Sequence, residues 1–375
     1  MEFSRLYFWI IYLTAFALAL IFTPLSIKIA VRTGAMDVPK DARRVHTHPI
    51  PRIGGMAIFI GVTAAVLLEL VLKLYLMHKG QLVPMASLKL TGIITGGVLI
   101  YLLGLADDLK GLAPMVKLAG QVACAGVAYA FGIRLTFIQQ LFGDVTFSGV
   151  ICCILTILWI VAIVNTINLV DGVDGLAAGI VAIASLCIAY VAYNNGYYTA
   201  CFAMLATAGG AMGFLPYNFY PAKTFMGDGG SLFLGFMIAS ISLIQPMKGT
   251  TVVAILIPGL VLALPIFDTL FAIFRRLVNR KPIMEADKGH IHHRLMKAGM
   301  GQRRTVLCMY GICGIMGIAA VLLSEERYVE MLGLCAVAVV YLAVVLTEKN
   351  KMLPSIRENK TKPDASGKAN GGGNK

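Results

Sequence analysis

Charged residues are scarce in this 375-residue chain: they make up 14% of it, whereas hydrophobic residues make up 58%. A soluble domain has about 25% charged and about 45–50% apolar residues, so this scarcity excludes an ordinary soluble protein. The chain also lacks a C-x-x-C pair, although it has eight cysteines. We therefore expect reduced cysteines that serve packing and no disulfide framework. An internal repeat is lacking too, which counts against a transporter built from inverted repeats.

The hydrophobic residues lie in stretches that are long enough to cross a bilayer, which takes roughly 20 apolar residues. The sequence predicts an all-α polytopic integral membrane protein with about eleven transmembrane helices. The first stretch has no A-x-A-like cleavage pattern, so we expect a retained span and not a signal peptide. The expected spans are 6–31, 53–76, 88–105, 115–131, 150–164, 176–193, 198–215, 232–247, 251–274, 305–323 and 328–346.

Lysine and arginine are distributed unequally between alternate loops. With the N-terminus outside, the inner loops carry 24 of these residues and the outer side carries seven. The positive-inside rule then predicts an outer N-terminus and a cytoplasmic C-terminus. The net charge of +13 is mainly a signal of topology, and no nucleic-acid partner is expected. We expect one transmembrane domain over 1–348 and a disordered cytoplasmic tail over 349–375, which has too little apolar surface to fold.

Four acidic clusters stand at the borders of the apolar stretches. Ionisable groups are costly at such places unless they have a function. The loop charges put all four on the inner side, which predicts one polar site that faces the cytoplasm. The clusters are Asp107-Asp108, Asp171 with Asp174, Asp228, and Asp287 beside the run His290-Ile291-His292-His293.

The first cluster joins two adjacent carboxylates. Asp107 and Asp108 repel each other, which favours a bound cation or a shared proton, although a solvated helix end is the alternative. Lys117 and Gln121 follow at the start of the next span and share one helix face. Lys117 is a candidate phosphate ligand, but taken alone it is better explained as an anchor at the inner leaflet.

The second and third clusters contain glycine as well as acids. Asn165, Asn168 and Asp171 are spaced by three, so a helical turn would present their polar atoms on one side. Asp228 precedes a predicted span in the run Met226-Gly227-Asp228-Gly229-Gly230-Ser231. Such a place suits an oxygen ligand of Mg²⁺ beside helix N-terminal amides that bind phosphate. A plain helix N-cap is the alternative.

The fourth cluster lies in the strongly basic inner loop 275–304. Its three histidines could bind Zn²⁺, but such sites usually recruit a cysteine or a further histidine at helical spacing, and no cysteine is near. A diphosphate fits the basic and imidazole groups at least as well. Asp268 lies in the preceding span, about two turns before Arg275-Arg276. It could orient an arginine or be structural.

Together these motifs, in this order, resemble the polyprenyl-phosphate N-acetylhexosamine-1-phosphate transferase family over about residues 10–346. The run His290-Ile291-His292-His293-Arg294 and the eleven expected spans are similar to its N-acetylglucosamine-1-phosphate branch. The resemblance implies transfer of a sugar 1-phosphate from a UDP-sugar to undecaprenyl or another polyprenyl phosphate, with release of UMP. It implies Mg²⁺, with Mn²⁺ as a substitute, a multi-pass plasma-membrane enzyme and a cytoplasmic site that starts a cell-envelope glycan or teichoic acid. A homodimer is a further expectation.

The resemblance also implies roles for individual residues. Asp228 is the metal ligand, with Asp171 beside it, and Asp107 deprotonates the lipid phosphate next to Asp108. His290 completes the catalytic set. The expected substrate contacts are Asn168 and Asp171 at the metal and phosphate pocket, Asp174, Asn218 and Phe225 at the uridine, Lys117 at the lipid phosphate, and Arg276, His290, His292, His293 and Arg294 at the diphosphate and sugar. The chain departs from the family at Ala106, where a bulkier apolar residue is usual.

Two other functions compete with this hypothesis. A divalent-metal or ion transporter would need ionisable groups deep in several spans, and only Asp268 fits that description in the sequence. A CDP-alcohol phosphotransferase resembles the pattern D-G-x-x-A-R, whereas Asp171-Gly172 is followed here by Val173-Asp174. The downstream polymer, the sugar epimer, the lipid length, the number of chemical steps and the oligomeric state stay open.

Overall fold

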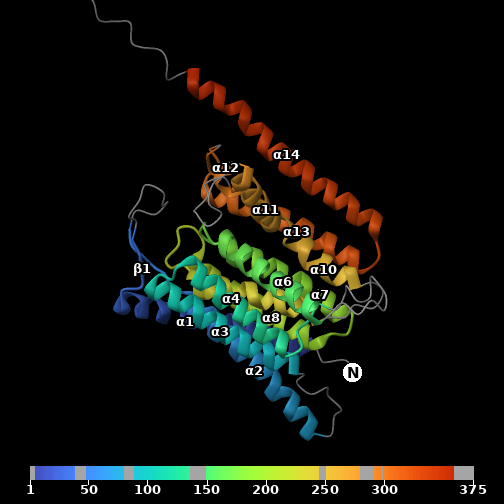
Figure 1. Cartoon of the computed structure of the whole chain (residues 1–375). Coiled ribbons are helices and arrows are strands. Elements are labelled where there is room, and N and C mark those ends of the chain that lie inside the picture. The colour runs from blue at the N-terminus through green and yellow to red at the C-terminus, as the bar shows by residue number, and fades with distance from the viewer. Residues whose placement is uncertain are drawn as a thin grey trace, which may run out of the picture.

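The computed structural model describes residues 5–38, 48–79, 88–135, 149–244, 251–278, 290–297 and 299–358. It is a bundle of helices with one short antiparallel ribbon, in which Met36 pairs with Pro51 and Asp37 with Ile50 (Figure 1). The elements are α1 (Arg5–Thr33), β1 (Met36–Asp37), β2 (Ile50–Pro51), α2 (Gly55–His78), α3 (Leu88–Lys110), α4 (Pro114–Ala130), α6 (Gly149–Val170), α7 (Leu176–Asn194), α8 (Tyr198–Asn218), α9 (Gly227–Ser242), α10 (Thr251–Val261), α11 (Ala263–Val278), α12 (Ile291–Lys297), α13 (Gln302–Ser324) and α14 (Tyr328–Glu358).

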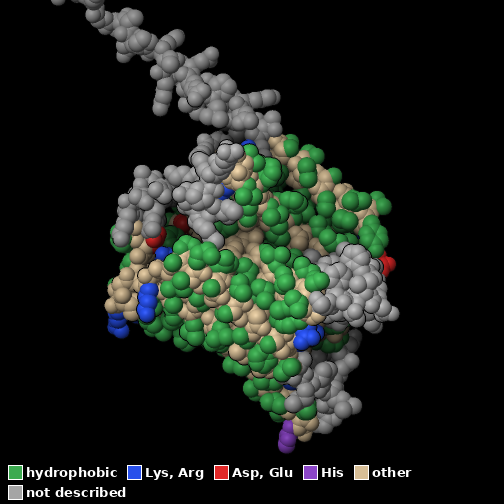
Figure 2. Space-filling model, viewed as in Figure 1, with side chains coloured by type: hydrophobic (Ala, Val, Ile, Leu, Met, Phe, Trp, Pro, Cys, Tyr) green, Lys and Arg blue, Asp and Glu red, His purple; other side chains and the backbone are tan. Residues whose placement is uncertain are grey.

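Seven of the described helices are long and apolar enough to cross a membrane, namely α1, α2, α3, α6, α7, α8 and α13. The chain is therefore a polytopic membrane protein, and its described residues are all-α apart from the ribbon, as the sequence predicts. Figure 2 shows apolar side chains over the flank of the bundle and basic side chains gathered toward its two ends. This distribution suits a protein whose flank is solvated by lipid.

Helix α9 lies inside the bundle and contacts α2, α3, α6 and α8. Every residue of α9 except Asp228 is buried. Glycines allow its neighbours to approach closely: a Cβ on Gly104 of α3 would lie 2.5 Å from the Asp228 carbonyl oxygen. A Cβ on Gly235 would lie 2.7 Å from Cα of Val164 in α6. Backbone contact with α3 and α6 thus fixes the position of Asp228.

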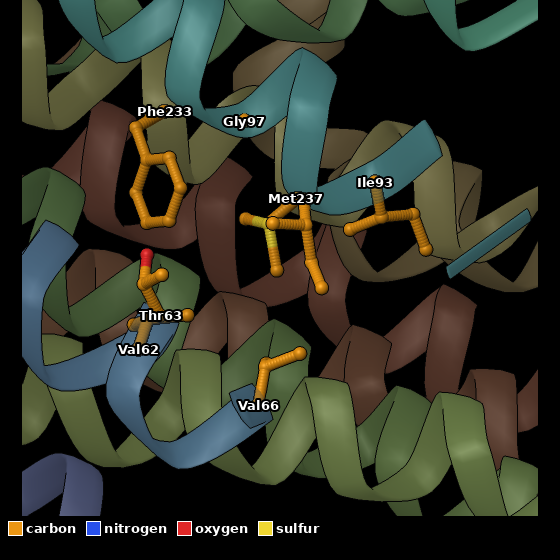
Figure 3. A pocket seen from close by; sticks show the side chains of 8 residues that line it. Val62, Thr63, Val66, Ile93, Gly97, Phe233 and Met237 are labelled. Carbon is orange, nitrogen blue, oxygen red and sulfur yellow. The ribbon is translucent and has the colours of Figure 1, made fainter. Parts of the chain in front are cut away.

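A small pocket opens between α2, α3 and α9 on the apolar flank (Figure 3). Thr63 supplies the polar side chain of its lining, and the other lining residues are Val62, Val66, Ile93, Ile94, Gly97, Phe233 and Met237. No titratable residue of the described chain lines this pocket. This pocket therefore offers no acid, base or charged side chain for catalysis.

Two helices extend further toward that end than the predicted spans. Helix α6 was expected to end at residue 164 but continues to Val170, so Asn168 lies in its last turn. Helix α9 was expected to begin at 232 but begins at Gly227, which puts Asp228 in its first turn. The predicted boundaries stop at polar residues, Asn165 in α6 and Ser231 in α9, although the backbone there is helical.

The C-terminal third differs from the predicted spans in two further ways. The expected span 251–274 is two helices, α10 and α11, separated at Leu262 a short way after Pro258. Helix α14 packs on α13 and continues to Glu358, past the boundary expected at 349. Residues 359–375 of the expected tail, and 136–148 of the expected outer loop, lie outside the described residues.

An ion pair inside α2 was not predicted. Lys73 Nζ lies 2.6 Å from Glu69 Oε1 and donates a hydrogen bond to Thr199 Oγ1 at 2.8 Å. Both charged side chains are buried. Asp268 is thus not the only ionisable residue inside a span, because Glu69 and Lys73 lie within α2.

Candidate active site

Four helices bring polar side chains together at the end of the bundle where β1 and α12 lie (Figure 1). Lys117 of α4 contacts the carboxylate of Asp228, and its Nζ lies 3.1 Å from Asp107 Oδ2. Asn168 of α6 donates a hydrogen bond to Asp228 Oδ1 at 2.8 Å. Acidic side chains are visible in a recess at this end in Figure 2. The structure therefore unites four residues that the sequence predicted.

Asp108 is bound to the start of α9. Its Oδ1 accepts a hydrogen bond from the Asp228 amide at 2.8 Å, and its Oδ2 accepts one from the Gly229 amide at 2.9 Å. A carboxylate at a helix N-terminus accepts hydrogen bonds from amides that have no intrahelical partner. Its negative charge also interacts favourably with the positive end of the helix dipole. The two members of the acidic doublet thus differ: Asp107 faces Lys117, while Asp108 holds the residue that carries the Asp228 carboxylate.

Arg52 belongs to the same site, and sequence reasoning missed it. Its Nε lies 3.1 Å from Asp108 Oδ1, and its terminal nitrogen Nη2 lies 3.9 Å from Asp228 Oδ1. The side chain is 37% exposed, so part of the guanidinium remains accessible. Hydrogen bonds from the Phe225 amide to the Pro51 carbonyl and from the Gly54 amide to the Phe225 carbonyl hold this segment beside α9. The spacing of residues in the sequence could not have predicted the contact of Arg52 with Asp108 and Asp228. It arises because the segment around Pro51 pairs with the distant segment around Phe225.

The loop between α6 and α7 gathers the residues expected at the uridine. Gly175 has a φ of +79° and donates its amide hydrogen to Asn218 Oδ1 at 3.1 Å. Asn218 donates in turn to the Thr224 carbonyl at 3.0 Å, next to Phe225. Asp174 accepts a hydrogen bond from the Ala222 amide at 3.0 Å. Asn218 is buried and its amide group is occupied by backbone, so in this structure it shapes the loop.

Asp171 lies in the turn directly after α6. Burial, together with the nearby charges of Asp228 and Asp108, raises the pKa of Asp171 well above its ordinary value. Lys117 already places one positive charge between two carboxylates of this site. The oxygen atoms of these side chains therefore form a site that can bind a cation.

That donor set fits Mg²⁺, which prefers oxygen ligands and is usually held by one or two carboxylates together with water and phosphate. Asp228 and Asp171 are the carboxylates that would hold it, with the side-chain oxygen of Asn168 nearby. Within the described ranges, no group of three or more His, Cys, Asp or Glu side chains is arranged to hold a metal ion. The Zn²⁺ alternative for the three histidines therefore gains no support.

Helix α12 brings the predicted histidines to this loop. Rings of His290 and His292 are parallel, with centroids 5.7 Å apart, and His293 lies 4.3 Å from His292. His292 Nε2 lies 3.7 Å from the place where a Cβ on Gly172 would stand. Burial, reinforced by neighbouring His293, lowers the pKa of His292 to about 3. The ring of His292 is therefore neutral at physiological pH.

Asp268 bonds to the residues at the start of α12. Its Oδ2 lies 3.0 Å from His290 Nδ1, and its Oδ1 accepts a hydrogen bond from the Ile291 amide. Arg276 is buried on the same face of α11 as Asp268, and Arg294 is exposed on α12. Asp287 lies outside the described residues.

Comparison with known proteins adds independent findings. The model of glycosyl transferase family 4 matches residues 90–245. The chain is 39% identical over 327 residues to a probable undecaprenyl-phosphate N-acetylglucosaminyl 1-phosphate transferase of Bacillus subtilis (strain 168), covering 87% of each chain. It is 34% identical over 353 residues to a decaprenyl-phosphate N-acetylglucosaminephosphotransferase of Mycolicibacterium smegmatis, covering 88% of this chain and 84% of the relative. It is 27% identical over 315 residues to the undecaprenyl-phosphate alpha-N-acetylglucosaminyl 1-phosphate transferase of Escherichia coli (strain K12), covering 80% of each chain.

Proposed function

The chain belongs to glycosyl transferase family 4, in the branch of polyprenyl-phosphate N-acetylglucosamine-1-phosphate transferases, and from this premise we propose that it makes a lipid-linked amino sugar. It transfers N-acetylglucosamine 1-phosphate from UDP-N-acetylglucosamine to undecaprenyl phosphate and releases UMP. The observation that carries the proposal is the contact of Lys117 with both Asp107 and Asp228 at one end of the bundle. Positioning and charge neutralisation are what phosphoryl transfer mainly requires.

The reaction is one in-line displacement. An oxygen of the lipid phosphate attacks the β-phosphorus of the UDP-sugar, a new P–O–P bond forms, and the bond to the UMP oxygen breaks. Asp107 accepts the proton of the lipid phosphate, and Lys117 holds that phosphate by its charge. A nucleophilic aspartate is unnecessary, because the lipid phosphate is itself a nucleophile.

Other residues of the same recess bind the metal ion, the diphosphate, the sugar and the uridine. Asp228 and Asp171 would hold Mg²⁺, whose charge would neutralise that of the diphosphate. Arg294 and the histidines of α12 contact the diphosphate and the sugar. Asp174 and Phe225 hold the uridine, and Arg276 supports the basic side of the site from α11.

The proposal includes an orientation. Eleven spans, with an outer N-terminus and a cytoplasmic C-terminus, put the recess at the inner surface of the plasma membrane. There a cytosolic UDP-sugar can meet a lipid that is confined to the bilayer. The excess of basic residues in the inner loops supports this orientation.

A transporter is the weaker candidate. Glu69 forms an ion pair with Lys73 within α2, Lys73 donates a hydrogen bond to Thr199, and Asp268 bonds to the start of α12. Both are local pairings, whereas a transport path needs polar groups in succession. The similarity to transferases over most of the chain favours the enzyme.

The test uses the full-length protein in lipid nanodiscs with radiolabelled UDP-N-acetylglucosamine and undecaprenyl phosphate. We expect labelled lipid product and UMP in equal amounts, loss of turnover in EDTA and recovery on addition of Mg²⁺. Asp228→Asn should lower kcat at least about 100-fold, the usual cost of removing a group that stabilises transition-state charge.

The matched control is Glu330→Gln, which alters an exposed acid at the start of α14. Its turnover should equal that of the wild type. Wild-type turnover by Asp228→Asn would remove that residue from the metal site. Cation uptake into proteoliposomes without a UDP-sugar, and without lipid product, would refute the transferase.

A further inference from the structure

Asp268 is a buried carboxylate of α11 whose two oxygens are both engaged at the start of α12. Oδ2 lies 3.0 Å from His290 Nδ1, and Oδ1 accepts a hydrogen bond from the Ile291 amide at 2.9 Å. The side chains of Asp268 and His290 are only 6% and 9% exposed. An ionised carboxylate can only accept hydrogen bonds. Nδ1 of His290 therefore carries a proton, and Nε2 is the nitrogen left for another partner.

We propose that Asp268 is a positioning residue that fixes the tautomer and the ring orientation of His290 for sugar-phosphate transfer. The inference rests on the proposed function and deepens the account of the same site. A carboxylate behind an imidazole sets which ring nitrogen is free and where it points. The parallel ring of His292, which reaches Gly172 beside Asp171, connects this pair to the loop of the active site.

The geometry separates this role from that of a simple helix cap. To cap α12, one oxygen at Ile291 is enough, and an asparagine would provide it as well as an aspartate. The bond to His290 needs a second acceptor, which only the carboxylate has. In Asp268→Asn the amide NH₂ faces Nδ1, which favours the opposite tautomer of His290. Asp268→Asn therefore keeps the hydrogen bond from the Ile291 amide and the size of the side chain. It reverses the direction of the hydrogen bond with His290 Nδ1.

Steady-state kinetics of the full-length protein in nanodiscs, with UDP-N-acetylglucosamine and undecaprenyl phosphate, test the proposal. We expect Asp268→Asn to lower kcat by about 10–100-fold, the usual effect of losing a partner that orients a functional histidine. KM for UDP-N-acetylglucosamine should change less than about twofold, since the effect is on the chemical step. Wild-type kcat in this variant would overturn the proposal.

The matched control is Glu69→Gln, which also converts a buried membrane carboxylate to an amide, in the ion pair of α2. It should lower the amount of folded protein without changing kcat per folded molecule. A fall in kcat equal to that of Asp268→Asn would show that any buried carboxylate has this effect, and would overturn the proposal.

A double-mutant cycle identifies the residue through which Asp268 acts. In a His290→Ala background, Asp268→Asn should cause no further loss, because the orienting bond is already absent. An equal loss with and without His290 would assign the effect to the cap of α12 and overturn the proposal.

A spectroscopic measurement keeps the test independent of turnover. Nitrogen-15 NMR of histidine-labelled protein in bilayers, with the His290 signal assigned by its disappearance in His290→Gln, reports protonation of each ring nitrogen. We expect a protonated Nδ1 in the wild type and its loss in Asp268→Asn. An unprotonated Nδ1 in the wild type would refute the inference. A protonated Nδ1 in a chain that forms no lipid product would refute the proposed function alone.

Discussion

At the scale of single residues, the ammonium group of Lys117 places one positive charge against two carboxylates of the site. It contacts Asp107 and Asp228, and its Nζ is 3.5 Å from Asn168 Oδ1. Lys117→Met would leave two carboxylates facing an incoming phosphate without their cation. We expect kcat to fall at least about 100-fold in the radiolabel assay. Lys110→Met, which changes an exposed lysine at the end of α3, is the matched control and should keep wild-type turnover.

His292 gives the site a measurable sensitivity to acid. Its pKa of about 3 in the folded protein lies below the ordinary 6.5, chiefly because of burial. Between these values the unfolded chain binds a proton that the folded chain does not, so stability falls as pH falls from about 6.5 toward about 3. Above about 6.5 this contribution is constant.

His292→Gln should remove that part of the pH dependence. We expect its thermal unfolding temperature in detergent to fall less between pH 7.5 and pH 5 than that of the wild type. His78→Gln, at the exposed end of α2, serves as the control and should follow the wild type. Identical slopes for His292→Gln and the wild type would contradict the buried, neutral state of this ring.

The sequence predicted the individual acids of the site better than their partners. Asp107 and Asp228 stand out because carboxylates are rare among apolar residues. Lys117 taken alone was better explained as an inner-leaflet anchor, and only the family resemblance implied a phosphate role; the structure brings it to both acids. The place of Arg52 and the backbone bonds of Asp108 could not be predicted, because each depends on a segment far away in the sequence.

At the scale of elements, the contact between α3 and α9 depends on a glycine. A Cβ at Gly104 would lie 2.5 Å from the Asp228 carbonyl oxygen and 2.6 Å from the Gly229 Cα. Gly104→Ala should push α9 away from Asp108 and cost about 1–3 kcal/mol of stability, as overpacking does. We also expect lower turnover, because Asp228 moves with the helix.

Gly126→Ala in α4 is the matched control for this prediction. A Cβ at Gly126 would meet no heavy atom within 4 Å apart from the nearby backbone of its own helix. Alanine in a helix interior gains about 0.5–1 kcal/mol over glycine, so this variant should unfold at an equal or higher temperature with full turnover. If both alanine variants behaved alike, close packing of α3 on α9 would not be what holds Asp228.

Hydropathy located most elements but misplaced their polar ends. The membrane-crossing part of α6 was recognised, while its last turn, with Asn168, was assigned to a loop. The break at Leu262 between α10 and α11 was missed, because the residues on both sides are apolar. A run of apolar residues predicts the part of a helix that crosses the hydrocarbon core. The residues at which the helix begins and ends are set by its backbone hydrogen bonds.

At the scale of the whole molecule, orientation is the property to be tested. Lys79 ends α2 on the expected outer side and Lys110 ends α3 on the expected inner side, and both are exposed. In intact cells, a membrane-impermeant maleimide should label Lys79→Cys but label Lys110→Cys only after permeabilisation. The wild type sets the background, since its eight cysteines are buried or half-buried. The reverse pattern would invert the orientation of the recess.

The burial of α9 also has a consequence for how the protein is made. Its most extensive contacts are with α3 and α6, which both precede it in the chain, so a ribosome delivers Asp107, Asp108 and Lys117 to the membrane before α9. Until α9 is made, Asp108 lacks the Asp228 and Gly229 amides that donate hydrogen bonds to it. A nascent chain that stalls before residue 227 should therefore carry these acids without the α9 amides that bind Asp108.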